Sequence, residues 1–229
     1  MADSTAGLPK QPWTRRLYLP AYAVAEAARY AGTPPNTVAY WHYWGGGLGP
    51  LLPGKERGKP LTYFQLIEVA FVATFRRLGV SLQRIRKARD YLGTHFDSEY
   101  PFADFRLQTE GHHILLDLRQ IEDDAELGRL VFADVAGQEG WQPLVGERFA
   151  EFDYEYGVAL VWHVAGRSSP VLIDPRVSFG APTVRGIPTW VIKGRWEAQE
   201  GIDEIVEDFR LEQEEVKGAL RFEGIQLAA

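Results

Sequence analysis

The side chains of this chain that could do chemistry are mainly cations, and they gather in its first 95 residues. Residues 1–95 carry 13 lysines and arginines against five acidic residues, a net charge of +8. Residues 96–229 carry 12 basic and 26 acidic residues, a net charge of −14, so the overall charge of −6 conceals two parts of opposite sign. A basic segment of this kind favours a polyanion such as nucleic acid as its partner. The alternative is that solvated helix faces simply differ in sign.

Two motifs that suggest phosphate or metal chemistry have the wrong surroundings. Gly49–Lys55 matches a P-loop up to its lysine, but Glu56 follows where a Ser or Thr should bind magnesium, and prolines remove backbone N–H donors. His112 and His113 suggest a metal site, but adjacent strand residues point to opposite faces and no third ligand is suitably spaced. We interpret the P-loop match as coincidental, assign the two histidines a structural or exposed role, and expect no metal or cofactor.

The sequence also lacks the marks of catalysis and of export. Acidic residues alternate at Glu151, Asp153 and Glu155, but carboxylates alone do not make an active site. With no cysteine in the chain, thiolate metal sites, iron–sulfur clusters and cysteine nucleophiles are excluded. No apolar run approaches the roughly 18 residues of a membrane span, and the first residues lack the core of a signal peptide. We therefore expect a non-enzymatic, cytoplasmic protein with no membrane partner.

Two short helices with a tight turn between them are predicted near the N-terminus. An Ala-rich helix begins near Tyr22 and ends at Gly32, and Pro34 and Pro35 suit the first turn of a second helix that runs to Tyr43. Such a helix-turn-helix presents the N-terminal half of its second helix to base edges in the major groove of DNA.

A Gly- and Pro-rich segment, residues 45–60, follows and is compatible with a two-stranded wing that has a cationic tip. Apolar periodicity then predicts a helix over residues 63–78 and another from Ser81 to about residue 95. Together these elements predict a winged helix-turn-helix. The residues expected to contact DNA are Arg15, Arg16, Arg29, Asn36, Thr37, Tyr40, His42, Lys55, Arg57 and Lys59.

The whole chain is predicted to be α+β and mainly helical, in four parts. These are a flexible arm at 1–16, the winged helix-turn-helix at 17–96, a central β-rich region at 97–169 and a C-terminal helical domain at 170–229. In the central region, alternating apolar residues predict hairpins over 105–116 and 152–164.

The C-terminal part is predicted to contain a strand at 171–173 and helices at 189–198, 202–209 and 211–222. The last two helices again have a helix-turn-helix shape, but Glu212, Glu214 and Glu215 would repel phosphates there. This part is therefore interpreted as a dimerisation or protein-binding unit. The tail residues that could insert into a groove of a protein partner are Phe222, Ile225 and Leu227.

Two stretches of the chain resemble known families. The first resembles the winged DNA-binding domain of MerR-like regulators and comprises Tyr22–Gly32, Asn36–Trp41, Leu61–Phe64 and Leu78–Leu82. The second resembles a small helical domain of an uncharacterised family found in many antitoxins and comprises Ile173–Pro175, Phe179–Pro182, Arg185–Thr189, Ile202–Ile205 and Phe209–Val216. Ala39 departs from the first pattern, because many MerR-like members have an arginine at that position.

In this order the two stretches are similar to a VapB-type antitoxin of mycobacteria or other actinobacteria. The resemblance implies a homodimer that represses its own operon by binding operator DNA and that neutralises a PIN-domain ribonuclease toxin. One alternative is a stand-alone MerR-like regulator that binds a small ligand among the aromatic residues Trp141, Tyr154, Tyr156 and Trp162. Another is a structural oligomer whose DNA-binding domain no longer binds DNA.

Overall fold

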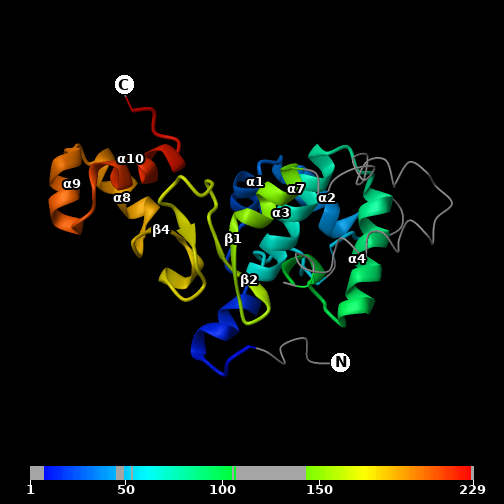
Figure 1. Ribbon diagram of the computed structural model, residues 1–229. Coiled ribbons are helices and arrows are strands. Elements are labelled where there is room, and N and C mark those ends of the chain that lie inside the picture. Colours follow the sequence, from blue (N-terminus) through cyan, green and yellow to red (C-terminus); the bar gives the residue numbers. More distant parts are fainter. Residues whose placement is uncertain (1–7, 45–48, 53, 105, 107–142, 228–229) are drawn as a thin grey trace.

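The computed structural model describes residues 8–44, 49–52, 54–104, 106 and 143–227. Figure 1 shows a helical part from the N-terminal half on one side, a second helical part from the C-terminal end on the other, and strands between them. The chain is therefore mixed α and β, as predicted. The arrangement brings segments far apart in sequence into contact, and these contacts decide which of the expected site residues are available to a partner.

The N-terminal helices lie where the periodicity predicts them: α1 (Val24–Ala31), α2 (Pro35–Tyr43), α3 (Tyr63–Arg77) and α4 (Leu82–Phe96). Gly32 ends α1 because it adopts a left-handed conformation, with φ +64°, that favours glycine. Thr62 begins α3 because its hydroxyl accepts a hydrogen bond from the Gln65 amide, and the Gln65 side chain accepts one from the Thr62 amide. Ser81 begins α4, and its hydroxyl accepts a hydrogen bond from the Arg84 amide.

Two expectations for the first 60 residues are wrong for the residues that the structure describes. Residues 12–16, the end of the expected arm, belong to the 3-10 helix η1 (Pro12–Tyr18), in which Leu17 is buried and the ring of Trp13 lies 5.9 Å from that of Tyr156. The expected wing has no paired strands within residues 49–52 and 54–60. Leu51 and Leu52 are buried there instead, and their amides bind the end of α2.

The second predicted hairpin is confirmed as β1 (Phe152–Glu155) and β2 (Val158–Trp162). Tyr156 and Gly157 both have positive φ, as a tight two-residue turn requires. The hairpin predicted over 105–116 lies outside the described residues, apart from residue 106. Short strands extend the sheet in chain order as an antiparallel meander, namely β3 (Leu172–Ile173), β4 (Pro182–Val184) and β5 (Ile187–Pro188).

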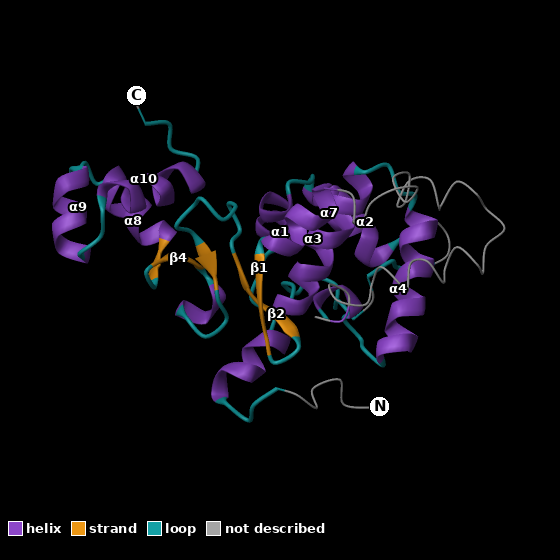
Figure 2. Cartoon of the chain, in the orientation of Figure 1, coloured by secondary structure: helices purple, strands orange, loops and turns teal. Residues whose placement is uncertain are grey.

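The hairpin is not an independent central region, because it shares a core with the N-terminal helices. The ring of Phe152 stacks on that of Phe71 in α3 at 5.6 Å, and the Tyr63 hydroxyl donates a hydrogen bond of 2.8 Å to the Leu160 carbonyl oxygen. The same core includes Phe149 of α7 (Pro143–Ala150), a helix that the sequence did not predict. Figure 2 shows the strands lying against these helices. The turns η3 (Pro101–Ala103) and η4 (Ser178–Gly180) were also not predicted.

The C-terminal helices are confirmed as α8 (Thr189–Glu197), α9 (Ile202–Phe209) and α10 (Gln213–Phe222). They surround a second core to which β4, β5 and Val171, the residue before β3, contribute. Its buried members are Val171, Val184, Ile192, Ile205, Leu211, Val216, Ala219 and Leu220. Among the helices that the structure describes, none combines the length and apolarity needed to cross a membrane.

Gly218 in α10 marks a close approach between that helix and Pro170. A Cβ atom at Gly218 would lie 2.7 Å from Cγ of Pro170, whereas one at Gly194 in α8 would meet open space. Replacing a helical glycine by alanine ordinarily stabilises a protein by about 0.5–1 kcal/mol. We expect that gain for Gly194→Ala, and a loss of about 1–3 kcal/mol for Gly218→Ala because the two segments must separate. Urea denaturation measures both, and a stabilising Gly218→Ala would contradict the close contact.

Candidate nucleic-acid interface

The second helix of the helix-turn-helix, α2, has one buried face and one exposed face. Val38 and Trp41 are buried in the core that includes residues of α1, as their predicted inward orientation requires. Asn36 and Tyr40 are exposed, and because residues four apart lie on the same side of a helix, they share the face that points away from the core. Thr37 beside them is half-buried. This face is the candidate base-reading surface.

Trp44 extends this exposed face at the end of α2. Its side chain is 69% exposed, whereas that of Tyr40 is 39% exposed. Trp44 lies four residues after Tyr40 and therefore continues the same stripe. Sequence reasoning did not include it, although the spacing 36, 40 and 44 was available as a signal.

His42 lies on the buried side of α2, so the structure does not place it with the expected DNA contacts. Its side chain is 3% exposed, and its Nδ1 atom lies 2.8 Å from the Leu52 carbonyl oxygen. Burial is the main cause that lowers the pKa of His42 to about 4, and the charges of Lys55 and Arg89 lower it further. The spacing 38, 41 and 42 follows the helical repeat and could have indicated this burial from the sequence.

The buried imidazole makes the stability of the chain sensitive to acid. The ordinary pKa of 6.5 falls to about 4 in the folded chain, so between these values only the unfolded chain binds the proton. We expect the contribution of His42 to stability to be complete above pH 6.5 and to fall by about 3 kcal/mol as the pH drops to 4. His42→Asn, whose amide nitrogen replaces Nδ1, should lack this loss. Urea denaturation from pH 4 to 7 measures the difference, and parallel pH profiles for the two proteins would contradict it.

Residues 49–52 and 54–60, which we call the cationic loop, lie beside the end of α2. The Lys55 ammonium donates a hydrogen bond of 2.8 Å to the Tyr43 hydroxyl and also binds the carbonyl oxygens of Glu56 and Lys59. Arg57 and Lys59 are exposed. The structure therefore places this loop next to the exposed face of α2. A DNA-binding surface needs both parts, because side chains on the helix contact bases and cations on the loop contact phosphates.

A cation of α4 also reaches the cationic loop. The Arg86 guanidinium donates a hydrogen bond of 2.6 Å to the Gly49 carbonyl oxygen. Arg84 and Lys87 lie on the same helix. These three residues are not among the predicted DNA contacts, although they form a dense basic run in the sequence, which is a signal of an adjoining anion site.

Two of the expected phosphate contacts are engaged within the molecule. Arg16 donates to the carbonyl oxygens of Pro175 and Arg176 and lies 4.4 Å from the centre of the Phe179 ring. Arg29 binds the C-terminal part, as described below. Arg15 is exposed on η1. Their positive charge was the reason to predict phosphate contacts for these arginines. The charge alone does not show whether an arginine binds DNA or another part of the same chain.

The expected partner-binding tail meets the helix-turn-helix at Arg29 and Tyr30. The Arg29 guanidinium donates a 3.0 Å hydrogen bond to the carbonyl oxygen of Phe222 and lies 3.4 Å from the Glu223 carboxylate. The ring of Phe222 stacks on that of Tyr30 at 5.8 Å. Phe222 is therefore already in contact with α1 of the same chain. Of the other two tail residues, Ile225 and Leu227 pack partly against the C-terminal core.

No group of three or more His, Asp or Glu side chains within the described ranges is arranged to hold a metal ion. The chemistry that the described surface offers at α2 and the cationic loop is hydrogen bonding from Asn36, aromatic contact from Tyr40 and Trp44, and positive charge from the loop. These are the groups that contact base edges, sugars and phosphates.

Two known proteins are similar to this chain over most of its length, and one family model matches its C-terminal part. VapB45, a candidate antitoxin of Mycobacterium tuberculosis, is 23% identical over 227 residues, which cover 90% of this chain and 94% of the relative. The crystal structure of Rv2018 from Mycobacterium tuberculosis has a TM-score of 0.75 and 24% identity, covering 90% of this chain and 99% of that one. The chain thus shares its fold with Rv2018. Residues 171–222 match a family described as a protein of unknown function, DUF433.

The DUF433 match covers β3 to α10 and so coincides with the C-terminal core. It corresponds to the stretch that resembles the helical domain found in many antitoxins.

Proposed function

We propose that this chain is the antitoxin of a toxin–antitoxin pair, which acts by binding rather than by catalysis. Its α1–α2 helix-turn-helix and cationic loop bind operator DNA, and its acidic C-terminal part binds and neutralises a PIN-domain ribonuclease toxin. The observation that carries the proposal is the likeness to the candidate antitoxin VapB45 along 90% of the chain, together with a basic helix-turn-helix at the expected place.

DNA binding is supported by the solvent-facing side of α2 and the charge around it. Asn36 stands in the first turn of α2, the part of a recognition helix that enters the major groove. Arg57 and Lys59 extend from the adjoining cationic loop. A homodimer would place two such surfaces on a palindromic operator, because the symmetry of the protein then matches that of the DNA.

The DNA half of the proposal is tested with Asn36→Ala and a duplex from the region upstream of the gene for this chain. An asparagine that reads adenine contributes about 1–3 kcal/mol of discrimination, so the variant should lose roughly 5- to 150-fold in specific affinity and little in non-specific affinity. Gln226→Ala, an exposed change in the tail, is the matched control. Equal binding by wild type and Asn36→Ala would contradict base reading by α2.

Toxin binding is supported by the acidic surface and the apolar tail. Exposed acidic residues lie along α9 and in the first turn of α10, and a ribonuclease needs a basic surface to hold RNA. An acidic antitoxin therefore complements such a surface. Ile225 and Leu227 keep part of their surface uncovered at the end of the chain, where an apolar groove of the toxin can take them up.

The toxin half is tested by co-expression with the PIN-domain nuclease encoded beside the gene. We expect the two chains to co-purify and RNA cleavage to stop. The double variant Ile225→Glu and Leu227→Glu should weaken the complex at least about tenfold, whereas Gln226→Glu adds a charge at the exposed position between them and should not. Thermal unfolding of the free chains shows whether each variant is folded. A neighbouring nuclease that neither binds nor is inhibited would refute the antitoxin function.

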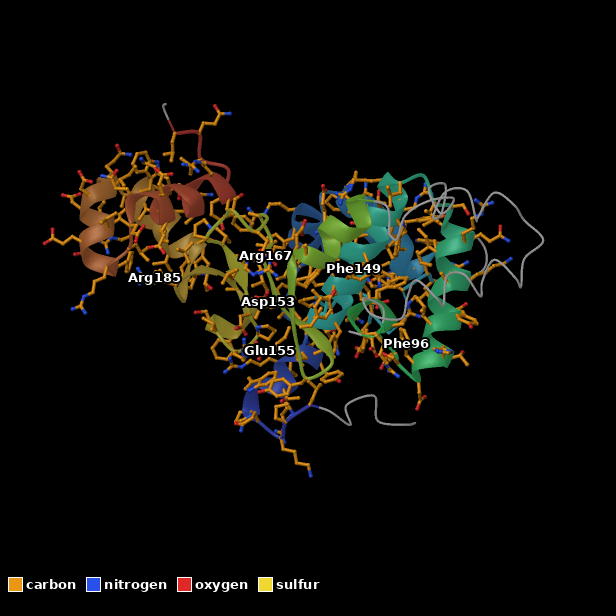
Figure 3. The ribbon with its side chains drawn as sticks, viewed as in Figure 1. Phe96, Phe149, Asp153, Glu155, Arg167 and Arg185 are labelled. Atoms are coloured by element: carbon orange, nitrogen blue, oxygen red, sulfur yellow. The ribbon has the colours of Figure 1, made fainter. Side chains whose placement is uncertain are left out.

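The alternative of a small-ligand regulator gains no support from the described residues. Trp162 is fully buried in the core, Tyr154 is half-buried at its edge, and Trp141 lies outside the described residues. A pocket of about 660 Å³ lies between residues 165–170 and α10. Its two arginines are already paired, Arg167 with Asp153 (Figure 3) and Arg221 with Glu214. Tyr154, Tyr156 and Trp162 are not among the residues that line this pocket.

A further inference from the structure

We infer that Lys55 and His42 are positioning residues, which hold the cationic loop against α2 in a shape that directs Arg57 and Lys59 toward phosphate. The sequence predicts all four of these residues as direct DNA contacts. The inference rests on the proposed DNA binding, but the state of the loop can be measured without DNA.

The start of the cationic loop is fixed to the last turn of α2. The amides of Leu51 and Leu52 donate to the Trp41 carbonyl oxygen, at 2.8 and 3.1 Å, and both leucine side chains are buried. His42 adds a third bond, because its Nδ1 atom lies 2.8 Å from the Leu52 carbonyl oxygen. A carbonyl oxygen only accepts, so Nδ1 carries the proton.

The other ring nitrogen of His42 does not add a second hydrogen bond within the described residues. In a neutral imidazole with the proton on Nδ1, Nε2 is an acceptor. Nε2 is buried and has no hydrogen-bond partner in the described structure. The nearby charges of Lys55 and Arg89 also favour the neutral ring. His42 therefore serves as a single donor to Leu52 and does not reach the surface.

The middle of the cationic loop is fixed by Lys55. Its ammonium makes three hydrogen bonds, to the Tyr43 hydroxyl in α2 and to the carbonyl oxygens of Glu56 and Lys59. It also lies 5.2 Å from the centre of the Tyr43 ring. An ammonium has three protons to donate, so these bonds use all of them. Lys55 thus closes the loop on itself and on α2.

Arg57 and Lys59 are left as the outward cations of the cationic loop. Arg57 has no partner among the described residues, and Lys59 pairs with Glu56 at 2.5 Å. Both members of that pair are more than half exposed, and an exposed ion pair contributes little, so a phosphate can replace Glu56. A loop already held in place loses less conformational entropy on binding, and this increases affinity.

The test compares the salt dependence of DNA binding among single variants of the full chain. Each phosphate contact contributes about −0.9 to the slope of log K against log salt concentration. Arg57→Gln and Lys59→Gln should each reduce the slope by that amount. Lys55→Met and His42→Leu should lower the affinity roughly three- to tenfold at every salt concentration and leave the slope unchanged. Both variants make the cationic loop less ordered but remove no contact with phosphate. Lys193→Met in α8 removes a distant cation and is the control.

Hydrogen exchange in the free chain provides the independent measurement. His42→Leu should speed exchange of the Leu51 and Leu52 amides, Lys55→Met should speed that of the Lys59 amide, and His42→Asn should restore protection of Leu51 and Leu52. A slope reduced by about 0.9 in Lys55→Met would show a direct phosphate contact and overturn the inference. Unchanged exchange would overturn it as well. A wild-type chain that binds no DNA would refute the proposed function, and the exchange data would still decide the state of the loop.

Discussion

Phe71→Ala should lower the free energy of unfolding by about 4 kcal/mol, within the range for large-to-small changes of a buried aromatic residue. Phe71 is fully buried at the point where α3, α7 and β1 meet. Its ring lies 5.2 Å from that of Phe149 and 5.6 Å from that of Phe152, both of which follow it by more than 70 residues. The cavity would therefore weaken both the N-terminal helices and the hairpin.

Urea denaturation followed by tryptophan fluorescence measures this effect, because Trp162 in β2 belongs to the same core. Phe75→Ala, one turn later on α3 and only partly buried, is the matched control and should cost less than half as much. A separate transition for the hairpin, or equal losses for the two variants, would mean that the strands do not share a core with α3.

Glu68→Ala should cost about 3–5 kcal/mol, because it leaves a buried arginine without its partner. The Glu68 carboxylate in α3 lies 3.0 Å from Nε of Arg89 in α4 and accepts a 2.7 Å hydrogen bond from the Phe102 amide. Both charged side chains are almost completely buried. Glu68→Gln keeps an acceptor for the Phe102 amide and is expected to lose less stability than Glu68→Ala. The helix α4, which carries Arg86 beside the cationic loop, is thus attached to the domain through this pair.

The pH dependence of Glu68 has the opposite sign to that of His42. Burial raises the pKa of Glu68 from 4.5 to about 7, and Arg89 offsets only part of this rise. Between these values the folded chain holds a proton that the unfolded chain has lost, so stability falls as pH rises. As the pH rises from 4.5 to 7, the free energy of unfolding of the wild type should fall by about 3 kcal/mol relative to that of Glu68→Gln. A gain over that interval would mean that pairing with Arg89 outweighs burial.

Features determined by short-range rules could be predicted from the sequence. Apolar residues three and four positions apart predict every described α-helix except α7 to within one or two residues, and Gly32 marks the turn of the helix-turn-helix because few other residues adopt its conformation without strain. The alternation around Gly157 gave β1 and β2 in the same way.

Features that depend on distant contacts could not be predicted. Strands β4 and β5 have only two or three residues each, too few for a periodic signal, and exist because β4 pairs with β3 and β5 pairs with β4. Within residues 49–52 and 54–60 the expected wing does not form, because Leu51 and Leu52 are buried and their amides bind the Trp41 carbonyl oxygen of α2. Arg16 and Arg29 bind segments that follow them by more than 150 residues, which no local pattern shows.

The most direct test of the proposed DNA interface is a titration of the wild-type chain with a duplex from the region upstream of its gene, at several salt concentrations. Arg57 and Lys59 each release about one counterion on binding, so log K should fall linearly with log salt concentration, with a slope of about −2 or steeper. Absence of binding at low salt, or binding that does not depend on salt, would contradict the claim that α2 and the cationic loop form a DNA-binding surface.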